Sequence, residues 1–151
     1  MRKLTAITII LALTLLTSCV PDTPDPPYGV WVSEEPRIVL FLKQEYRIPV
    51  ASPSYPALYE LDGVELKVFV SISTGPQFGI YHLGSLSEGG GPSGPALLIG
   101  PYRVVANEIR YTLNPPFQER LGISTIVFRL MEDYDPIDPY YWFPHFFPRS
   151  E

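Results

Sequence analysis

The chain has 151 residues, 18% of them charged, and a formal net charge of −5 at pH 7. This acidic balance argues against nucleic-acid binding and against electrostatic docking to anionic lipid, because both require clustered basic side chains. The single cysteine excludes an intramolecular disulfide, so folding has to rest on a hydrophobic core. The 18 prolines and 11 glycines predict a chain rich in loops and poor in helix.

The N-terminus has the three parts of an export signal. Arg2 and Lys3 give a positive start, residues 7–16 form an apolar run interrupted only by threonine, and small residues follow at positions 17 and 18. This run is too short for a transmembrane helix, which needs about 20 apolar residues. We therefore expect residues 1–18 to be a signal peptide that is helical in its apolar part.

The segment Leu16-Thr17-Ser18-Cys19 places one aliphatic and two small residues directly before the only cysteine. It resembles the lipobox of bacterial lipoproteins. The resemblance implies cleavage between Ser18 and Cys19, with diacylglyceryl and fatty-acyl groups such as palmitate on the new N-terminal cysteine. The alternatives are an ordinary secretory signal with an incidental free thiol, or cleavage at another position.

Lipid at Cys19 would anchor the protein to the membrane. One acyl chain binds only marginally, and each buried methylene adds about 0.8 kcal/mol, so two chains make the attachment durable. Removal of residues 1–18 leaves nine basic and sixteen acidic residues, a formal net charge of −7. We therefore expect lipid, and not charge, to hold the protein on the outer side of the cell membrane. Val20 is not the aspartate that resembles an inner-membrane retention signal, so in a Gram-negative host we expect the outer membrane.

Residues 19–27 form a proline-rich tether. Four of the residues at positions 20–27 are proline, which predicts an extended, semi-rigid segment with about 3.1 Å per residue. Residues 28–131 follow, and their length suits one domain with one core. We expect this domain to be all-β.

The domain opens on a recognisable pattern in residues 28–42. Trp31 is expected to fill one end of the fold, and residues 37–42 read as a strand that is buried on both faces. The opening resembles that of small uncharacterised bacterial lipoproteins, and its Gly-x-Trp start is similar to lipocalin-like barrels. The resemblance implies a small antiparallel barrel and carries no activity. The matching residues are Gly29, Trp31, Ser33, Glu34, Pro36, Ile38, Leu40 and Leu42.

Short apolar segments separated by turn residues predict a small antiparallel barrel or sandwich of seven to eight strands, with no amphipathic helix. Asp62-Gly63 is the best hairpin turn, and the strand after it alternates, with Val68 and Val70 on its inward face. Loops are expected at residues 49–57 and 114–122, and Gly100-Pro101 is expected to interrupt a strand. The expected strands are residues 37–42, 58–61, 64–73, 78–83, 96–99, 102–105, 108–113 and 124–130, with a tight turn at Ala106-Asn107.

Residues 132–151 form an acidic, aromatic, proline-rich tail. Seven of the 20 aromatic residues lie between positions 134 and 147, and the prolines forbid a helix. One interpretation is a tail that packs over a barrel end and buries its rings. The other is an exposed interaction surface for a partner or for the membrane interface, made of Tyr140, Tyr141, Trp142, Phe143, Phe146 and Phe147.

The sequence contains no motif that supports catalysis or a cofactor. His82 and His145 lack zinc-ligand spacing, and Ser85 and Ser87 lack a nucleophile elbow. The glycines at positions 89–94 lack a P-loop pattern, and the carboxylates at 133–138 lack the glycine and bidentate glutamate of a calcium loop. Glu34 and Glu35 are adjacent on an expected strand, so we expect them on opposite faces.

We therefore expect no enzyme, no cofactor, no metal site and no nucleic-acid partner. The prediction is a membrane-anchored lipoprotein that acts as a non-catalytic interaction module of the cell envelope, with an envelope protein or glycan as partner. The alternative is a lipocalin-like carrier of a small apolar ligand, since eight-stranded barrels can enclose one small molecule.

Overall fold

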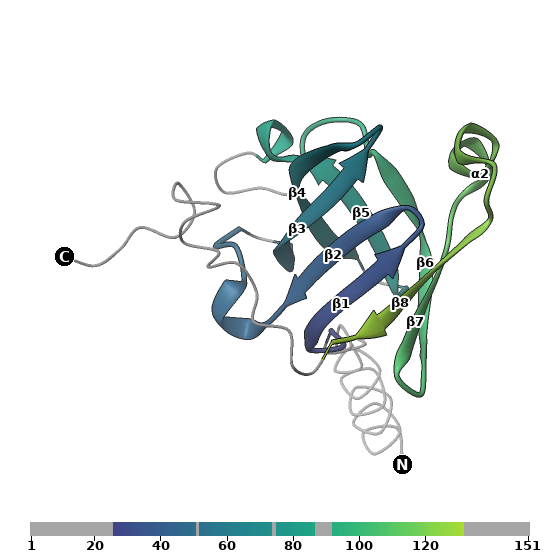
Figure 1. The fold of residues 1–151 in the computed structure, drawn as a ribbon. Helices are drawn as coiled ribbons and strands as arrows, with labels where there is room; N and C mark the ends of the chain where they lie inside the picture. Colours follow the sequence, from purple (N-terminus) through teal and green to yellow (C-terminus); the bar gives the residue numbers. More distant parts are fainter. Residues whose placement is uncertain (1–25, 51, 74, 87–91, 132–151) are drawn as a thin grey trace, which may run out of the picture.

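The computed structural model describes residues 26–50, 52–73, 75–86 and 92–131, and the strands within them close into one antiparallel barrel (Figure 1). Each strand pairs with the strand before it, and the last pairs with the first. The all-β prediction is confirmed, in its barrel form. The strands are β1 (Gly29–Glu34), β2 (Arg37–Leu42), β3 (Ser54–Leu61), β4 (Val64–Ser73), β5 (Gln77–His82), β6 (Leu98–Val105), β7 (Glu108–Thr112) and β8 (Thr125–Leu130).

Two hairpin turns form where they are predicted. Asp62 and Gly63 both have positive φ angles, 52° and 77°, as tight hairpin turns require, and they join β3 to β4. Ala106, with φ of 53°, and Asn107 join β6 to β7. Short turns of this kind set the antiparallel pairing of neighbouring strands.

The prediction of a loop over residues 49–57 is wrong at its C-terminal end, because β3 already begins at Ser54 and pairs with β4 from there. Pro56 lies within the strand. β3 pairs with β2 only over residues 57–59, so Pro56 has a strand neighbour on one side alone. A proline is tolerated at such an edge position, where its missing N–H interrupts no second ladder.

The predicted interruption at Gly100-Pro101 is also wrong, because β6 runs continuously through both residues. Gly100 has no side chain, and a Cβ built on it would overlap the carbonyl oxygen of Thr112 on β7. The glycine therefore allows the close approach of two strands. Pairing with β5 includes Gly100 and Pro101, and beyond them the Tyr102 N–H donates to the Pro76 carbonyl at 2.9 Å.

A short helix, α2 (Pro115–Leu121), replaces the predicted loop over residues 114–122. Proline at the first helical position is favourable, because its missing N–H would have no partner there. Gly122 ends the helix in the left-handed region, with φ of 70°, and its N–H donates to the Gln118 carbonyl at 2.8 Å. Two 3-10 turns, η1 (Gln44–Tyr46) and η2 (Leu83–Ser85), complete the described elements. Among the described residues, no helix has the length and hydropathy needed to cross a membrane.

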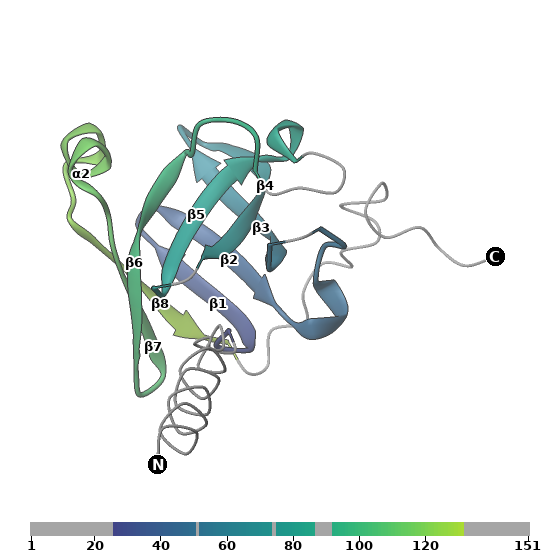
Figure 2. The same ribbon diagram turned by 180° about the vertical axis from the view of Figure 1, so that it is seen from behind.

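Alternate side chains on every strand fill the barrel. On β4 the predicted inward face is confirmed, because Val68, Val70 and Ile72 belong to the central core. Its outward face is buried too at Phe69 and Ser71, which goes beyond the half-buried strand that was predicted. Figure 2 shows β4, β5 and β6 as the wall that faces β1 and β2 across this core.

Candidate functional site

The inside of the barrel is filled with side chains. Leu40, Val70, Phe78 and Tyr111, which come from four different strands, are all 0% exposed. A cavity large enough for water would leave accessible surface on the side chains that line it. These positions therefore pack directly against other atoms, at the density that is typical of protein cores.

Stacked aromatic rings occupy part of this core. The ring centroids of Phe78 and Tyr102 lie 3.8 Å apart with their planes at 12°, and Tyr111 meets Phe78 edge-on at 5.7 Å. The Tyr111 hydroxyl donates to the Phe78 carbonyl at 3.1 Å. Burial raises the pKa of Tyr111 well above its usual value, so its phenol stays protonated at physiological pH. Every buried polar side-chain atom in the described ranges has a hydrogen-bond partner, so the core presents no unpaired polar group there.

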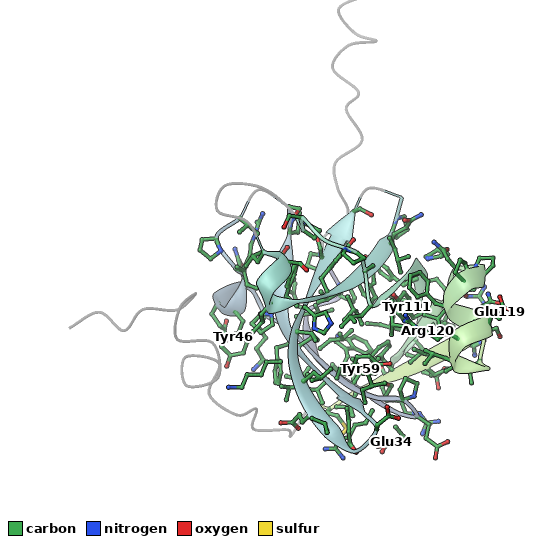
Figure 3. The ribbon with its side chains drawn as sticks, turned by 90° about the horizontal axis from the view of Figure 1, so that it is seen from above. Glu34, Tyr46, Tyr59, Tyr111, Glu119 and Arg120 are labelled. Carbon is green, nitrogen blue, oxygen red and sulfur yellow. The ribbon has the colours of Figure 1, made fainter. Side chains whose placement is uncertain are left out.

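Helix α2 lies at the upper end of the barrel in Figure 1. Phe117 and Leu121 from this helix pack against the core. Arg120 lies 5.2 Å from the Phe117 ring centroid and donates to the Leu97 carbonyl, which ties the helix to the start of β6. In Figure 3, Arg120 points from α2 toward Tyr111 and Tyr59 within the ring of strands. Burial raises the pKa of Tyr59, an effect that the Arg120 charge opposes and Asp62 reinforces.

Trp31 belongs to the core, and its position at one end of the barrel stays a prediction. Its indole N–H donates to the Pro27 carbonyl at 2.8 Å. Trp31 also pairs with Leu130, the last residue of β8. The first and last strands therefore meet at the backbone of Trp31.

The seam between β1 and β8 is much shorter than the strands that form it. Only two residue pairs, Trp31↔Leu130 and Val32↔Arg129, join them, whereas β8 pairs with β7 from Thr125 to Arg129. Residues 125–128 of β8 and 33–34 of β1 therefore have a described strand neighbour on one side only. The two strands diverge above the seam (Figure 1).

The Ser33 hydroxyl connects the end of β1 to the turn that follows it. Its hydroxyl donates to the Pro36 carbonyl at 2.6 Å and accepts from the Ile38 N–H at 3.2 Å. The side chain is buried, and so is its bond to Ile38, whereas its bond to Pro36 is partly exposed. They fasten the end of β1 to the turn and to β2.

A groove of about 570 Å³ follows the divergence of the two strands, and we call it the seam groove. Its apolar surface comes from one side chain of β1 and two at the β8 side. Its charges lie at the end of β1, in the β1–β2 turn and on β8. Val127 and Met131 are exposed within it. The lining residues are Val32, Glu34, Glu35, Thr125, Val127, Arg129 and Met131.

The charges of the seam groove are separated. Glu34 and Glu35 both line it, so the expectation that they lie on opposite faces is wrong. Strand alternation ends at Glu34, the last residue of β1, and Glu35 lies in the turn. On the β8 wall, Arg129 forms a long ion pair with Glu108 at 3.8 Å, which Arg110 shares at 3.6 Å. The Arg129 side chain is 77% exposed, and exposed pairs contribute little, so its guanidinium can turn toward a ligand.

The residues predicted for function lie mostly outside the described ranges. These are Ser18, Cys19 and the tail residues Tyr140, Tyr141, Trp142, Phe143, Phe146 and Phe147. His145, which was not expected to bind zinc, also lies outside these ranges. His82 is exposed at the end of β5, and Ser85 lies in η2, while Ser87 is again outside the description. In the ranges that are described, no three metal-ligating side chains come together.

Sequence reasoning missed the seam groove. Its two walls lie about 90 positions apart in the sequence, and only the closure of the barrel brings them together. One signal was present, because Val127 and Met131 are apolar residues outside the inward pattern of the last strand. No family model matches the chain, and comparisons with curated proteins and with solved structures give no match either.

Proposed function

We propose that the protein is a lipid-anchored, non-catalytic interaction module of the bacterial cell envelope, and that the seam groove is its binding surface. The observation that carries the proposal is the two-residue seam between β1 and β8. It leaves the backbone of residues 125–128 with a strand partner on one side only. The lipobox-like segment ending at Cys19 supports the membrane location.

An extended polypeptide segment fits this surface best. A strand edge offers backbone N–H and carbonyl groups to a partner, and alternate side chains beside it give specificity. On β8 the outward positions are Thr125, Val127 and Arg129, so an added strand would meet a polar, an apolar and a basic side chain in turn. Among the described lining residues none is aromatic, so the groove has no ring on which a sugar could stack. An envelope protein is therefore favoured over a glycan.

The carrier function is the alternative, since closed eight-stranded barrels can hold one small ligand. Such a carrier needs an internal cavity of about 300 Å³ or more. The fully buried side chains of Leu40, Val70, Phe78 and Tyr111 argue against one. The proposed function therefore places recognition on the outside of the barrel.

Native mass spectrometry distinguishes the two functions. For residues 20–151 isolated from the envelope compartment of the host, we expect the mass of the polypeptide alone. A filled core leaves no space for a resident ligand. An additional mass that organic extraction releases would contradict the proposal and would identify the class of the carried ligand.

In-cell photo-crosslinking tests the seam groove itself. We expect p-benzoylphenylalanine at Val127 to form a discrete crosslink with an envelope protein, because this valine is 40% exposed within the groove. The matched control is Val105, a valine on β6 that is 45% exposed and outside the groove. Equal crosslinking at both positions, or none at Val127, would exclude the groove as the binding surface.

A further inference from the structure

Four apolar side chains are buried on the outside of the barrel wall that β1, β2 and β3 form. They are Val30, Val39, Phe41 and Leu58, and we call them the outer cluster. Successive side chains on a strand point to opposite faces. Their neighbours Trp31, Ile38 and Leu40 belong to the central core, so the outer cluster points away from it.

The outer cluster is almost completely inaccessible to solvent. Its members are only 2–4% exposed, although each lies on the outward face of a barrel strand. An outward-facing valine on another strand is much more exposed, since Val127 on β8 is 40% exposed. The wall formed by β1 to β3 is therefore covered.

Two partly buried side chains are the described apolar neighbours of this surface. Val32 and Tyr46 pack against the outer cluster, and Tyr46 reaches it from η1. Both side chains are themselves only partly buried, so a further segment can add to the cover that they give Phe41 and the three aliphatic side chains.

The chain leaves the barrel beside this surface. The Met131 N–H donates to the carbonyl of Val30, a member of the outer cluster, at 2.9 Å. Residues 132–151 continue from that point. Twenty extended residues span about 65 Å at roughly 3.3 Å each, whereas three strands are only about 15 Å wide at about 4.8 Å each. The tail is therefore long enough to cross the wall.

The composition of the tail suits this surface. Seven aromatic residues lie between positions 134 and 147, and they supply the apolar area that the outer cluster requires. Four carboxylates precede most of the rings, at positions 132, 133, 135 and 138. Lys43 and Arg47 flank η1, which also carries Glu45, so basic side chains outnumber acidic ones at this turn.

We propose that residues 132–151 fold back across the outer faces of β1, β2 and β3 and bury their aromatic rings on the outer cluster. The tail is then a permanent part of the wall and covers neither barrel end. Its rings are not the interaction surface, which leaves that role to the seam groove. The N-terminal segment, a second copy and an envelope partner are the other possible occupants, and the experiment distinguishes them.

Intramolecular photo-crosslinking in the full-length protein, in its own membrane, tests the proposal. We replace Tyr46 with p-benzoylphenylalanine and map the products by mass spectrometry. The expected product links position 46 to the tryptic peptide of residues 130–149, with the crosslink within positions 139–148. Tyr46 and Tyr81 both pack against the cluster of Ile48 and Phe69, but only Tyr46 also packs against the outer cluster. Tyr81 is therefore the matched control and is expected to give no such product. A crosslink from position 46 to residues 1–27, or to another polypeptide, would overturn the proposal.

Tryptophan fluorescence gives a second readout that needs no unnatural residue. The chain contains two tryptophans, Trp31 and Trp142, so the spectrum of the native protein minus that of Trp142→Phe reports Trp142. Emission at short wavelength, with acrylamide quenching several-fold weaker than that of free tryptophan, is the expected result. Emission and quenching like those of free tryptophan would show an exposed ring and would contradict the proposal.

Discussion

Replacement of Gly100 by alanine is expected to lower the free energy of unfolding by about 3 kcal/mol or more. The added Cβ would overlap the Thr112 carbonyl oxygen and would lie 2.9 Å from the carbonyl carbon and 3.1 Å from the Leu113 Cα. All three are backbone atoms of one segment, so no side chain can rotate away to relieve the contact. The strands have to separate, although the Asn114 N–H donates to the Ile99 carbonyl at 2.9 Å beside this point.

Thermal and denaturant unfolding of residues 20–151 measure this effect. A loss of 3 kcal/mol corresponds to a Tm about 12 °C lower or more for a domain of this size. Gly84→Ala is the matched control, because Gly84 is exposed in η2 and a Cβ there meets no atom within 4 Å. Gly79→Ala should fall between the two, since its Cβ would meet only the Tyr81 side chain, which can move. Equal stability of the Gly100 and Gly84 variants would contradict the close approach of β6 and β7.

The parts of the fold that local pattern determines were predictable from sequence. Alternation placed Val68 and Val70 inside, and Asp62-Gly63 fixed a hairpin, because both signals depend on neighbours along the chain. Residues 37–42 were correctly predicted as a strand buried on both faces. The outer cluster supplies the physical reason, since Val39 and Phe41 have a covered surface of their own.

The wrong predictions of strand boundaries occur where contacts with a strand distant in the sequence determine the local structure. Proline and glycine normally interrupt strands. Here, however, Pro56 lies where β3 pairs with a neighbour on one side only, and Gly100-Pro101 lies where the backbones of β6 and β7 approach closely. Neither circumstance is visible in the local sequence. The missed helix is different, because Asn114, the prolines after it and Gly122 form a recognisable start and stop. The prediction treated those prolines only as an indication of a loop, and so it missed the helix.

The seam groove could not be predicted for the same reason as the strand errors. Its walls meet only because β8 closes on β1, and the length of that seam depends on the register of the whole barrel. Even Glu34 and Glu35, which were noted as neighbours, were placed on opposite faces, because the end of the strand could not be located to one residue. Boundaries of this kind decide which side chains share a site.

Replacement of Cys19 by alanine is expected to move the protein from the membrane fraction to the soluble fraction. The reason is the size of the lipid contribution, since two acyl chains hold a protein durably and one chain only marginally. Charge does not compensate, because the chain after residue 18 carries a net charge of −7 and is repelled by anionic lipid. The apolar run at residues 7–16 is also too short to span a bilayer if cleavage fails.

Cell fractionation with a high-salt wash measures this change, and the mass of the N-terminal peptide measures lipidation directly. Val20→Ala is the matched control, because it alters the neighbouring residue and keeps the thiol, so it should remain fully in the membrane fraction. The two readouts separate the possible causes. A Cys19→Ala protein that stays in the membrane after the wash, or a native N-terminal peptide that carries no acyl mass, would show that lipid at Cys19 is not the anchor. Loss of the acyl mass together with release into the soluble fraction would place the whole attachment at this one residue.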